Sequence, residues 1–265
     1  MAFWNSSTFR PGPIIGLAFA FVVSCSLVYY SLTLTFSSFD GDIEMKFPKS
    51  MDDVKVLALA LSEFMDGHYF AVLYSYIVLY IFLQAFAVPG SAMLSVLGGA
   101  LFTKWPALFL ICLCSGIGAT ICYLISYYIA SPIVERYLTE RLVAWSEQIA
   151  SRREHLLNYL MFLRITPILP NWFINIASPH LDVPVGVFFV ATFFGVAPIS
   201  FLHVQAGMAI QELSAGKEIS LFNVTTILTI TAAATLSLLP VIYNKRNPEE
   251  IPTMSQSERS PLLPK

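Results

Sequence analysis

Long runs without a single charged side chain dominate this 265-residue sequence. Asp, Glu, Lys and Arg are all missing from residues 13–35, 69–103, 105–130, 183–204 and 221–243. A helix rises 1.5 Å per residue, so about 20 apolar residues cross a hydrocarbon core of ~30 Å. Backbone polar groups must be satisfied internally in lipid, and long apolar runs satisfy them as helices. The pattern therefore predicts an all-α integral membrane protein.

The composition excludes most soluble classes. Hydrophobic residues make up 56% of the chain and charged residues only 12%, whereas a soluble domain carries roughly 25% charged residues. So few charges cannot cover a water-exposed surface, which argues against soluble enzymes and disordered chains. The 15 basic and 17 acidic residues give a net charge of −2. Nothing therefore indicates a nucleic-acid partner, which would attract an excess of basic residues.

The uncharged run at 69–103 has the wrong length for ordinary membrane spans. Its 35 residues would form a helix of about 52 Å, too long for one crossing and too short for two crossings and a turn. Pro89 removes a backbone donor and Gly90 frees φ, so the helix should break there. We expect a re-entrant hairpin, with Gln84 and Ser91 on either side of the break. These two side chains either join helices by hydrogen bonds or line a path for lipid headgroups.

A second re-entrant hairpin is predicted at 157–181. Pro167 and Pro170 rule out a single straight helix there, and Arg164 is the only charged residue of the stretch. A mid-bilayer arginine costs at least ~2.5 kcal/mol on insertion scales. It should therefore face protein, water or a lipid phosphate, unless it extends to the headgroups or caps a hairpin carbonyl.

Two asparagines follow these prolines. Asn171 and Asn175 are four residues apart, so a helix would place them on one face. They either line a wet groove or bond the carbonyls that the prolines leave free. The spacing alone does not decide between these roles.

Small residues inside the spans predict close helix packing. Gly116 and Gly118 lie in the middle of the run at 105–130, and Gly195 and Pro198 interrupt the run at 183–204. Small side chains let helices approach closely in lipid. The four cysteines lie in apolar runs, and the sequence has no cluster of His and Cys and no catalytic motif. We therefore expect no metal, no cofactor and no catalytic residue.

The runs and the charges between them give a layout. In chain order we expect a cytosolic N-terminus (1–12), a transmembrane anchor (13–35), a lumenal loop with an interfacial helix (36–68), a core (69–207), a transmembrane helix (221–243) and a disordered cytosolic tail (244–265). The core contains the two hairpins, the spans at 105–130 and 183–204, and an amphipathic helix at 131–156 that Ser131 would cap. A cleaved signal peptide is the alternative for the anchor, but its apolar core would have only ~7–15 residues.

The order of these segments predicts an inverted repeat. Each re-entrant hairpin is followed by a transmembrane helix, and further transmembrane helices flank the two units, as in transporters with broken helices at mid-membrane. Nine basic residues fall on one side of this layout and five on the other. Because basic residues concentrate in cytosolic segments, the imbalance favours cytosolic termini and a cytosolic amphipathic helix.

Two stretches resemble the VTT-domain (DedA-like) superfamily, and in particular its eukaryotic transmembrane protein 41 type. The first reads Phe-Ala-Val-Pro-Gly-Ser at 86–91 and continues to Leu-Gly-Gly-Ala-Leu-Phe at 97–102. The second, longer stretch reads Phe-Leu-Arg-Ile-Thr-Pro-Ile-Leu-Pro-Asn-Trp-Phe-Ile-Asn at 162–175. The resemblance extends over roughly residues 69–207.

The resemblance implies two facing hairpins and energy-independent scrambling of phospholipids in the endoplasmic reticulum membrane, with sterols as a further candidate substrate. It also implies support of autophagosome formation and lipid mobilisation, with bridge-type lipid-transfer proteins and autophagy membrane proteins as partners. Bacterial relatives have an acid on each side of the first break and a second arginine in the second hairpin. Here Gln84, Ser91 and Pro170 stand at those places. None of these three residues is a titratable acid, which argues against proton coupling. The absence of such acids fits a passive path for lipid past Arg164, Asn171 and Asn175.

Two other functions stay open on the sequence. An ion-coupled secondary transporter would fit the inverted repeat but needs a coupling carboxylate, for which Asp182 near a membrane edge is the candidate. A non-transporting scaffold would act through the amphipathic helix and the tail. A sequence at 258–263 resembles an acidic dileucine sorting signal, so an endosomal or lysosomal membrane is the alternative location.

Overall fold

The structure is a computed structural model. It describes residues 12–36, 48–131, 152–166 and 169–214, together with residues 134, 142–143, 145–146 and 149–150. The predicted span at 221–243 and the tail lie outside the described residues, as does Pro167. Within the described ranges every regular element is helical, which confirms the prediction of an all-α protein.

Helix α1 (Gly12–Phe36) occupies the first predicted span. Many of its large apolar side chains face outward, and Phe19 is 70% exposed. The helix contacts α2 (Met51–Ala85) through Phe21, whose ring centroid lies 5.7 Å from that of Phe82 and 5.1 Å from that of Phe86. Such an apolar surface is suited to lipid.

Helix α2 starts with a capping box and is kinked near its middle. The Ser50 hydroxyl accepts a hydrogen bond from the Asp53 N–H at 3.1 Å, and the Asp53 carboxylate accepts one from the Ser50 N–H at 2.9 Å. His68 has a non-helical backbone (φ −134°, ψ 33°). The segment before this kink is the helix expected in the loop, and its buried side chains include Val54 and Leu61.

The first hairpin consists of α2 from Gly67 onward and of α3 (Ser91–Leu101). The break between its arms contains Pro89 and Gly90, and Gly90 has φ 130°, a value that side chains disfavour. The arms are unequal, because Gly67–Ala85 has 19 residues and is apolar enough to cross a membrane. Helix α3 has 11 residues, about 16 Å. By length alone α3 is too short to cross, whereas the first arm is long enough.

Helix α4 (Lys104–Ile125) continues into a π-helical turn, η1 (Ser126–Ala130). Ser131 keeps a right-handed helical backbone (φ −45°, ψ −49°). The prediction that Ser131 caps a new helix is therefore wrong, because an N-cap residue has an extended backbone. Turns of π-helix insert an extra residue into the helical repeat.

The expected amphipathic helix at 131–156 lies mostly outside the described residues. Those described within it include Val134, Leu142, Trp145 and Ile149, which are helical and buried, as the apolar stripe requires. The backbone of Arg152 is not helical (φ −117°, ψ 18°), and the short 3-10 helix η2 (Arg153–His155) follows it. The predicted end at residue 156 is therefore too late.

The second hairpin consists of α6 (Leu156–Ile165), α7 (Asn171–Ala177) and η3 (Ser178–Leu181). Neither arm approaches the roughly 20 residues that a crossing requires. After it come α8 (Val185–Gly195) and α9 (Ala197–Ser214), separated at Val196. Among the described residues four apolar segments are long enough to cross a membrane: 14–33, 67–85, 104–130 and 185–212.

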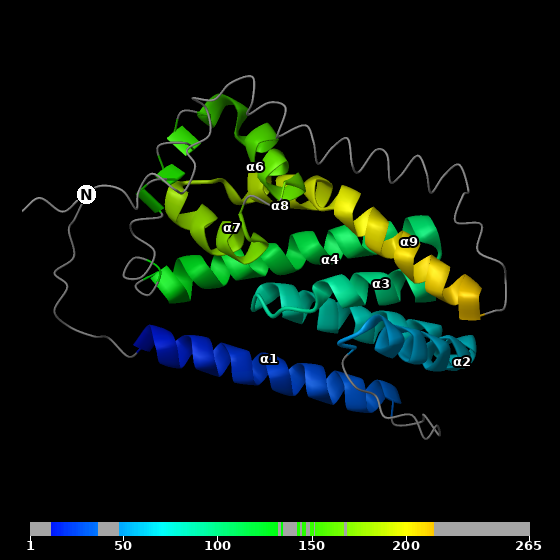
Figure 1. The fold of residues 1–265 in the computed structure, drawn as a ribbon. Helices are drawn as coiled ribbons and strands as arrows, with labels where there is room; N and C mark the ends of the chain where they lie inside the picture. Colours follow the sequence, from blue (N-terminus) through cyan, green and yellow to red (C-terminus); the bar gives the residue numbers. More distant parts are fainter. Residues whose placement is uncertain are drawn as a thin grey trace, which may run out of the picture. The chain divides into compact units, whose positions relative to one another are not determined.

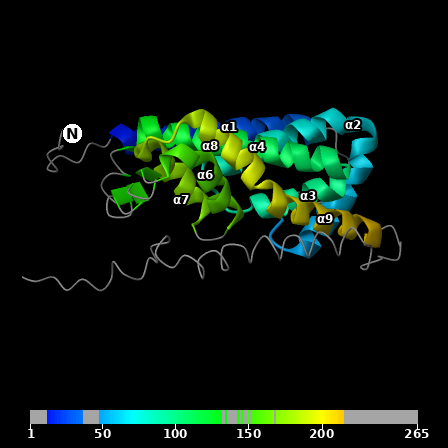
Figure 2. The ribbon, with the colours of Figure 1, turned by 90° about the horizontal axis from the view of Figure 1, so that it is seen from above.

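Helix α4 is the centre of the described core, and the two hairpins lie toward its opposite ends (Figures 1 and 2). The open end of the first hairpin lies at the start of α4, where the Tyr69 ring contacts that of Phe102 at 6.1 Å. The second hairpin is joined to the other end of α4. There the Tyr123 hydroxyl donates to the Val183 carbonyl and the Ser126 hydroxyl to the Ile176 carbonyl, both at 2.8 Å.

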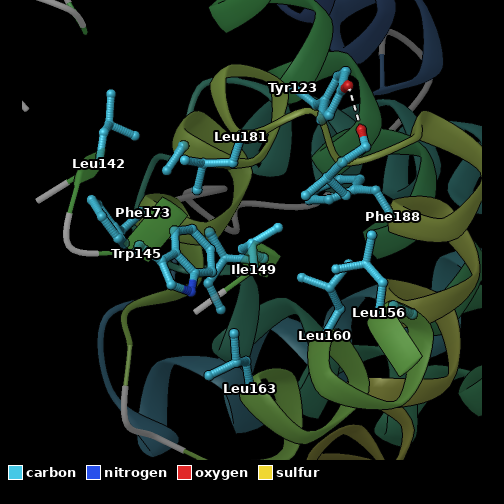
Figure 3. Packing of buried hydrophobic residues seen from close by; sticks show 14 of the residues in the cluster. Tyr123, Leu142, Trp145, Ile149, Leu156, Leu160, Leu163, Phe173, Leu181 and Phe188 are labelled. Atoms are coloured by element: carbon cyan, nitrogen blue, oxygen red, sulfur yellow. Dashed lines mark hydrogen bonds between the residues drawn. The ribbon is translucent and has the colours of Figure 1, made fainter. Parts of the chain in front are cut away.

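Two apolar clusters fill these two ends. The cluster around the second hairpin brings Trp145 and Phe173 together with side chains of α6 and α8, among them Leu160 and Phe188 (Figure 3). The cluster around the first hairpin joins both parts of α2 to α3, α4 and α9. Each hairpin is therefore packed against protein, the condition under which irregular backbone is tolerated at membrane depth.

Candidate functional site

Arg164 lies near the end of α6 and is buried, with 7% of its surface exposed. Its Nη2 donates a hydrogen bond to Asn175 Oδ1 at 2.7 Å. Its guanidinium carbon lies 5.0 Å from the centroid of the Phe188 ring, a cation–π distance. Among the described residues no carboxylate pairs with it. A full cation is thus held by a neutral amide and an aromatic face.

Gly195 of α8 provides the space for Arg164. A Cβ atom added at Gly195 would lie 2.6 Å from Arg164 Cβ and 3.3 Å from the Met161 carbonyl oxygen. No side chain fits between α6 and α8 at this point. Pro198 lies in the first turn of α9, directly after the break at Val196.

The two asparagines are not brought together. Asn175 is 2% exposed and faces Arg164, whereas Asn171 is exposed. The reason is local: α7 begins at Asn171, directly after Pro170, so Asn171 occupies the first helical position at the hairpin break. The two asparagines are four residues apart in one helix, as predicted, but one amide is buried and the other is exposed.

Gln84 has the corresponding place in the first hairpin. It is the last residue but one of α2 and is half-buried. A Cβ atom added at Gly118 of α4 would lie 2.5 Å from Gln84 Cβ and 3.0 Å from the Ile81 carbonyl oxygen. Ser91, also half-buried, is the first residue of α3, and its carbonyl accepts a hydrogen bond from the Ser95 hydroxyl at 2.9 Å.

A buried hydroxyl cluster, Tyr80–Ser95–Ser115, accompanies this break and was missed by the sequence analysis. Tyr80 Oη lies 3.0 Å from Ser95 Oγ and 3.1 Å from Ser115 Oγ, so the cluster joins α2, α3 and α4. All three residues are at least 95% buried. Helical spacing offered one signal, because Tyr80 precedes Gln84 by four residues and Ser95 follows Ser91 by four.

The two breaks approach the same part of α4. Gln84 packs on Gly118, and Cys122, one turn further along α4, is close enough to Arg164 to interact with its charge. Gly116, half a turn before Gly118, packs against the Phe189 ring of α8. Residue 117 is the midpoint of the apolar segment 104–130. Residues from the two breaks therefore approach α4 within about one turn of each other, at Gly118 and Cys122.

The element boundaries of the two hairpins recur at a constant offset. The first arms end at 85 and 165, the second arms begin at 91 and 171, and they end at 101 and 181, each pair differing by 80. The offset pairs Gln84 with Arg164, Ser91 with Asn171 and Ser95 with Asn175. The positions of polar side chains thus recur as well, although the residues differ.

Chemistry other than lipid contact finds little support in these residues. Asp182, the only candidate for a coupling carboxylate, is exposed in a turn with a left-handed backbone (φ 54°), outside the hairpin break. In the described part of the chain no group of three or more His, Cys, Asp or Glu side chains could hold a metal ion. As far as the structure describes the chain, the site consists of the two helix breaks and the buried cation of Arg164.

The helices and the two breaks define a polytopic membrane protein with broken apolar segments, and the comparisons assign it to a family. The VTT domain matches residues 88–209, which include both breaks. The chain is 52% identical over 204 residues to transmembrane protein 41B of Homo sapiens, covering 77% of this chain and 69% of the relative. It is 47% identical over 238 residues to transmembrane protein 41B of Danio rerio, covering 88% and 82%. No solved structure matches. The chain belongs to the transmembrane protein 41 family of VTT-domain membrane proteins.

Proposed function

We propose that the chain is an energy-independent phospholipid scramblase. The observation that carries the proposal is Arg164, a cation buried at a helix break and bonded to a neutral amide, with no carboxylate partner among the described residues. A buried arginine in a membrane segment is costly and is typical of a functional site. Phosphate is the charged group that every phospholipid must bring across the membrane.

The arrangement of the hairpins supports a path from either leaflet. We infer that the units α2–α4 and α6–α9 form an inverted repeat, with hairpins that enter from opposite membrane surfaces. Their open ends lie at opposite ends of α4 and their breaks approach its middle. In such a repeat a substrate site lies near the bilayer midplane. Headgroups would move along the breaks while acyl chains remain in the hydrocarbon.

The Arg164–Asn175 bond is suited to exchange. A guanidinium can donate two parallel bonds to an anionic phosphate, whereas Asn175 accepts one bond with a neutral oxygen, so phosphate oxygens compete well with the Asn175 oxygen. Asn175 still shields the cation when no lipid is present. Because Arg164 is 7% exposed, access requires the second hairpin to move away from α8, and the contact at Gly195 contains no side chain that would interlock with it.

The family suggests where such an activity would operate. We propose the endoplasmic reticulum membrane, with both termini in the cytosol, and a supporting role in autophagosome formation and lipid mobilisation. Bridge-type lipid-transfer proteins deliver or remove lipid from one leaflet, so a scramblase beside them would equalise the two leaflets. Sterols are a further candidate substrate.

The test uses purified protein in liposomes whose two leaflets carry fluorescent phospholipid. A membrane-impermeant reductant should bleach both pools in the native protein without any ion gradient. Arg164→Met, which keeps an unbranched side chain and removes the charge, should slow bleaching of the inner pool at least tenfold. Asn158→Ala alters an exposed amide on the same helix, away from the break, and is the matched control.

Two results would count against the proposal. If only the outer pool is reducible with native protein, the chain does not scramble lipid under these conditions. If native protein scrambles and Arg164→Met does so equally fast, the path does not involve the buried cation. A scaffold would show no bleaching of the inner pool, while Arg152→Glu with Arg153→Glu would still abolish its cellular role.

A further inference from the structure

Lys104, the first residue of α4, is held by two aromatic rings. Its Nζ lies 4.7 Å from the centroid of the Phe201 ring on α9 and 5.6 Å from that of Trp105. The two rings contact each other at 6.1 Å. A lysine ammonium has three hydrogen-bond donors, and among the described residues Lys104 has neither an acceptor nor a carboxylate partner. The rings fix the position of the cation and leave its donors available.

An aromatic seam continues from Lys104 along α4 and α8. It consists of Trp105, Phe109, Phe189, Phe193 and Phe201. The rings of Phe109 and Phe193 contact at 5.8 Å, and Phe193 is followed by Phe189, which packs against Gly116. Trp105 is 67% exposed and Phe109 is 60% exposed. The seam is therefore an apolar outer surface with a single cation at one end.

The length of the seam corresponds to one membrane leaflet. Twelve residues separate Lys104 from Gly116 on α4, about 18 Å of helix. Half of a ~30 Å hydrocarbon core is about 15 Å. With Lys104 and Trp105 at the headgroup level, where lysine and tryptophan are common, the seam ends at the bilayer midplane. That end lies two residues from Gly118, where the first hairpin break packs.

We propose that Lys104 and the aromatic seam form a binding site for one phospholipid with a net negative headgroup. The phosphate accepts hydrogen bonds from Lys104 Nζ, and an acyl chain lies along Phe109 and Phe193. A zwitterionic headgroup binds more weakly, because its own cation is repelled by Lys104. Occupancy of this surface site does not depend on scrambling, since it requires no opening of the hairpins.

Brominated lipids test the proposal, because bromine quenches tryptophan fluorescence on contact. The probe protein is the full chain with Trp105 as its sole tryptophan, obtained with Trp4→Phe, Trp145→Phe and Trp172→Phe. It is placed in vesicles of zwitterionic lipid that contain a minor fraction of brominated phosphatidylserine or brominated phosphatidylcholine. One basic side chain near a membrane surface favours an anionic lipid about fivefold. We expect that preference for brominated phosphatidylserine, and its loss in Lys104→Gln.

Two controls separate a built site from general attraction. Lys55→Gln removes an exposed lysine before the first hairpin and should leave the preference unchanged. Phe201→Leu removes one of the two rings that position the ammonium and should lower the preference without abolishing it. Equal quenching by both lipids in the parent protein would overturn the proposal, as would an unchanged preference in Lys104→Gln.

A second measurement covers the case in which the triple tryptophan variant does not fold. The native chain and Trp105→Phe are compared in the same vesicles, and the difference between their spectra is the contribution of Trp105. The same preference should be found in that difference. If Trp105 contributes no lipid-selective quenching there, the proposal fails even when the protein scrambles lipid.

Discussion

The two hairpins share their element boundaries but differ in chemistry. At corresponding positions the first has Gln84, Ser91 and Ser95, and the second has Arg164, Asn171 and Asn175. The first hairpin is joined to α4 by neutral hydroxyls, since Tyr80 bridges Ser95 and Ser115. At the break of the second hairpin the buried polar pair lies within the hairpin itself, from α6 to α7. The bonds of this hairpin to the end of α4, from Ser126 and Tyr123, lie at its open end.

This difference suggests a division of roles between the hairpins. Three buried hydroxyls that satisfy one another across α2, α3 and α4 fix these helices together, because separating them would leave polar groups unpaired in an apolar core. The Arg164–Asn175 bond joins two parts of the second hairpin, and at this break the contact with the neighbouring span α8 is made through the Phe188 ring. We infer that the first hairpin is the fixed wall of the path and that the break of the second hairpin, away from its bonds to the end of α4, is the part that moves.

The largest expected effect comes from removing the acceptor of the buried cation. Asn175→Leu keeps the number and branching of the side-chain heavy atoms but leaves the Arg164 guanidinium buried without its acceptor, which should destabilise the second hairpin by about 3 kcal/mol. In a protein with Cys122 as its sole cysteine, the rate of thiol labelling should rise, because Cys122 is close enough to Arg164 to interact with its charge. With Cys114 as the sole cysteine the rate should not change, since Cys114 belongs to the cluster of the first hairpin.

The double variant Asn175→Leu with Arg164→Met is the control for this result. It removes the cation together with its acceptor, so labelling of Cys122 should return toward the native rate. If both cysteines respond equally to Asn175→Leu, the two hairpins open together and the division of roles is wrong.

A smaller effect is expected from filling the contact between α6 and α8. Gly195→Ala would place a methyl group 2.6 Å from Arg164 Cβ, and overpacking of this kind costs about 1–3 kcal/mol. The temperature of thermal unfolding in detergent should fall, and the rate of lipid scrambling should change as well. Gly186→Ala on the same helix is the matched control, because nothing lies within 4 Å of its added Cβ. An equal shift of the unfolding temperature in both variants would show that the effect comes from α8 itself and not from the contact with Arg164.

The breaks could be predicted from the sequence because their causes are local. Pro89 and Gly90 change the backbone whatever surrounds them, and a lone arginine in an apolar stretch must find a polar partner. The identity of that partner depends on where α7 begins, and Pro170 sets this start so that Asn175 and not Asn171 faces Arg164. The Tyr80 cluster could not be predicted in the same way, since it joins three helices. The continuation of the helix through Ser131 likewise overrides a local capping signal.

Removing one hydroxyl from the first hairpin should have a still smaller effect. Tyr80→Phe deletes the atom that bonds both Ser95 and Ser115, at a cost of about 1 kcal/mol per hydrogen bond lost. Ser95 keeps its hydrogen bond to the Ser91 carbonyl, so its hydroxyl is not left without a partner. Labelling of Cys114 should increase while that of Cys122 stays the same, the reverse of the Asn175→Leu result. Tyr74→Phe, at a 56% exposed site on the same helix, should alter neither rate.

The smallest effect concerns the capping box at the start of α2, which should influence only the helical segment that precedes the first hairpin. Hydrogen bonds from the Lys49 N–H, and then from the hydroxyl and N–H of Ser50, lower the pKa of Asp53 below its ordinary value of 3.8. The stabilisation is therefore complete above pH 3.8 and is lost as the pH falls through the lower pKa of the folded protein. Amide exchange in residues 51–67 should accelerate in that acidic range, whereas exchange in α6 should not respond to this group.

Two variants separate the cap from a general effect of acid. Asp53→Asn should make exchange in residues 51–67 independent of pH over this range, apart from the intrinsic dependence of exchange itself. Ser50→Ala should speed exchange there at neutral pH, since loss of a serine N-cap costs about 1 kcal/mol. Equal acceleration in α6 would show that the start of α2 is coupled to the second hairpin. The first hairpin could then not be a fixed wall, because a change at its outer end would reach the mobile part through it.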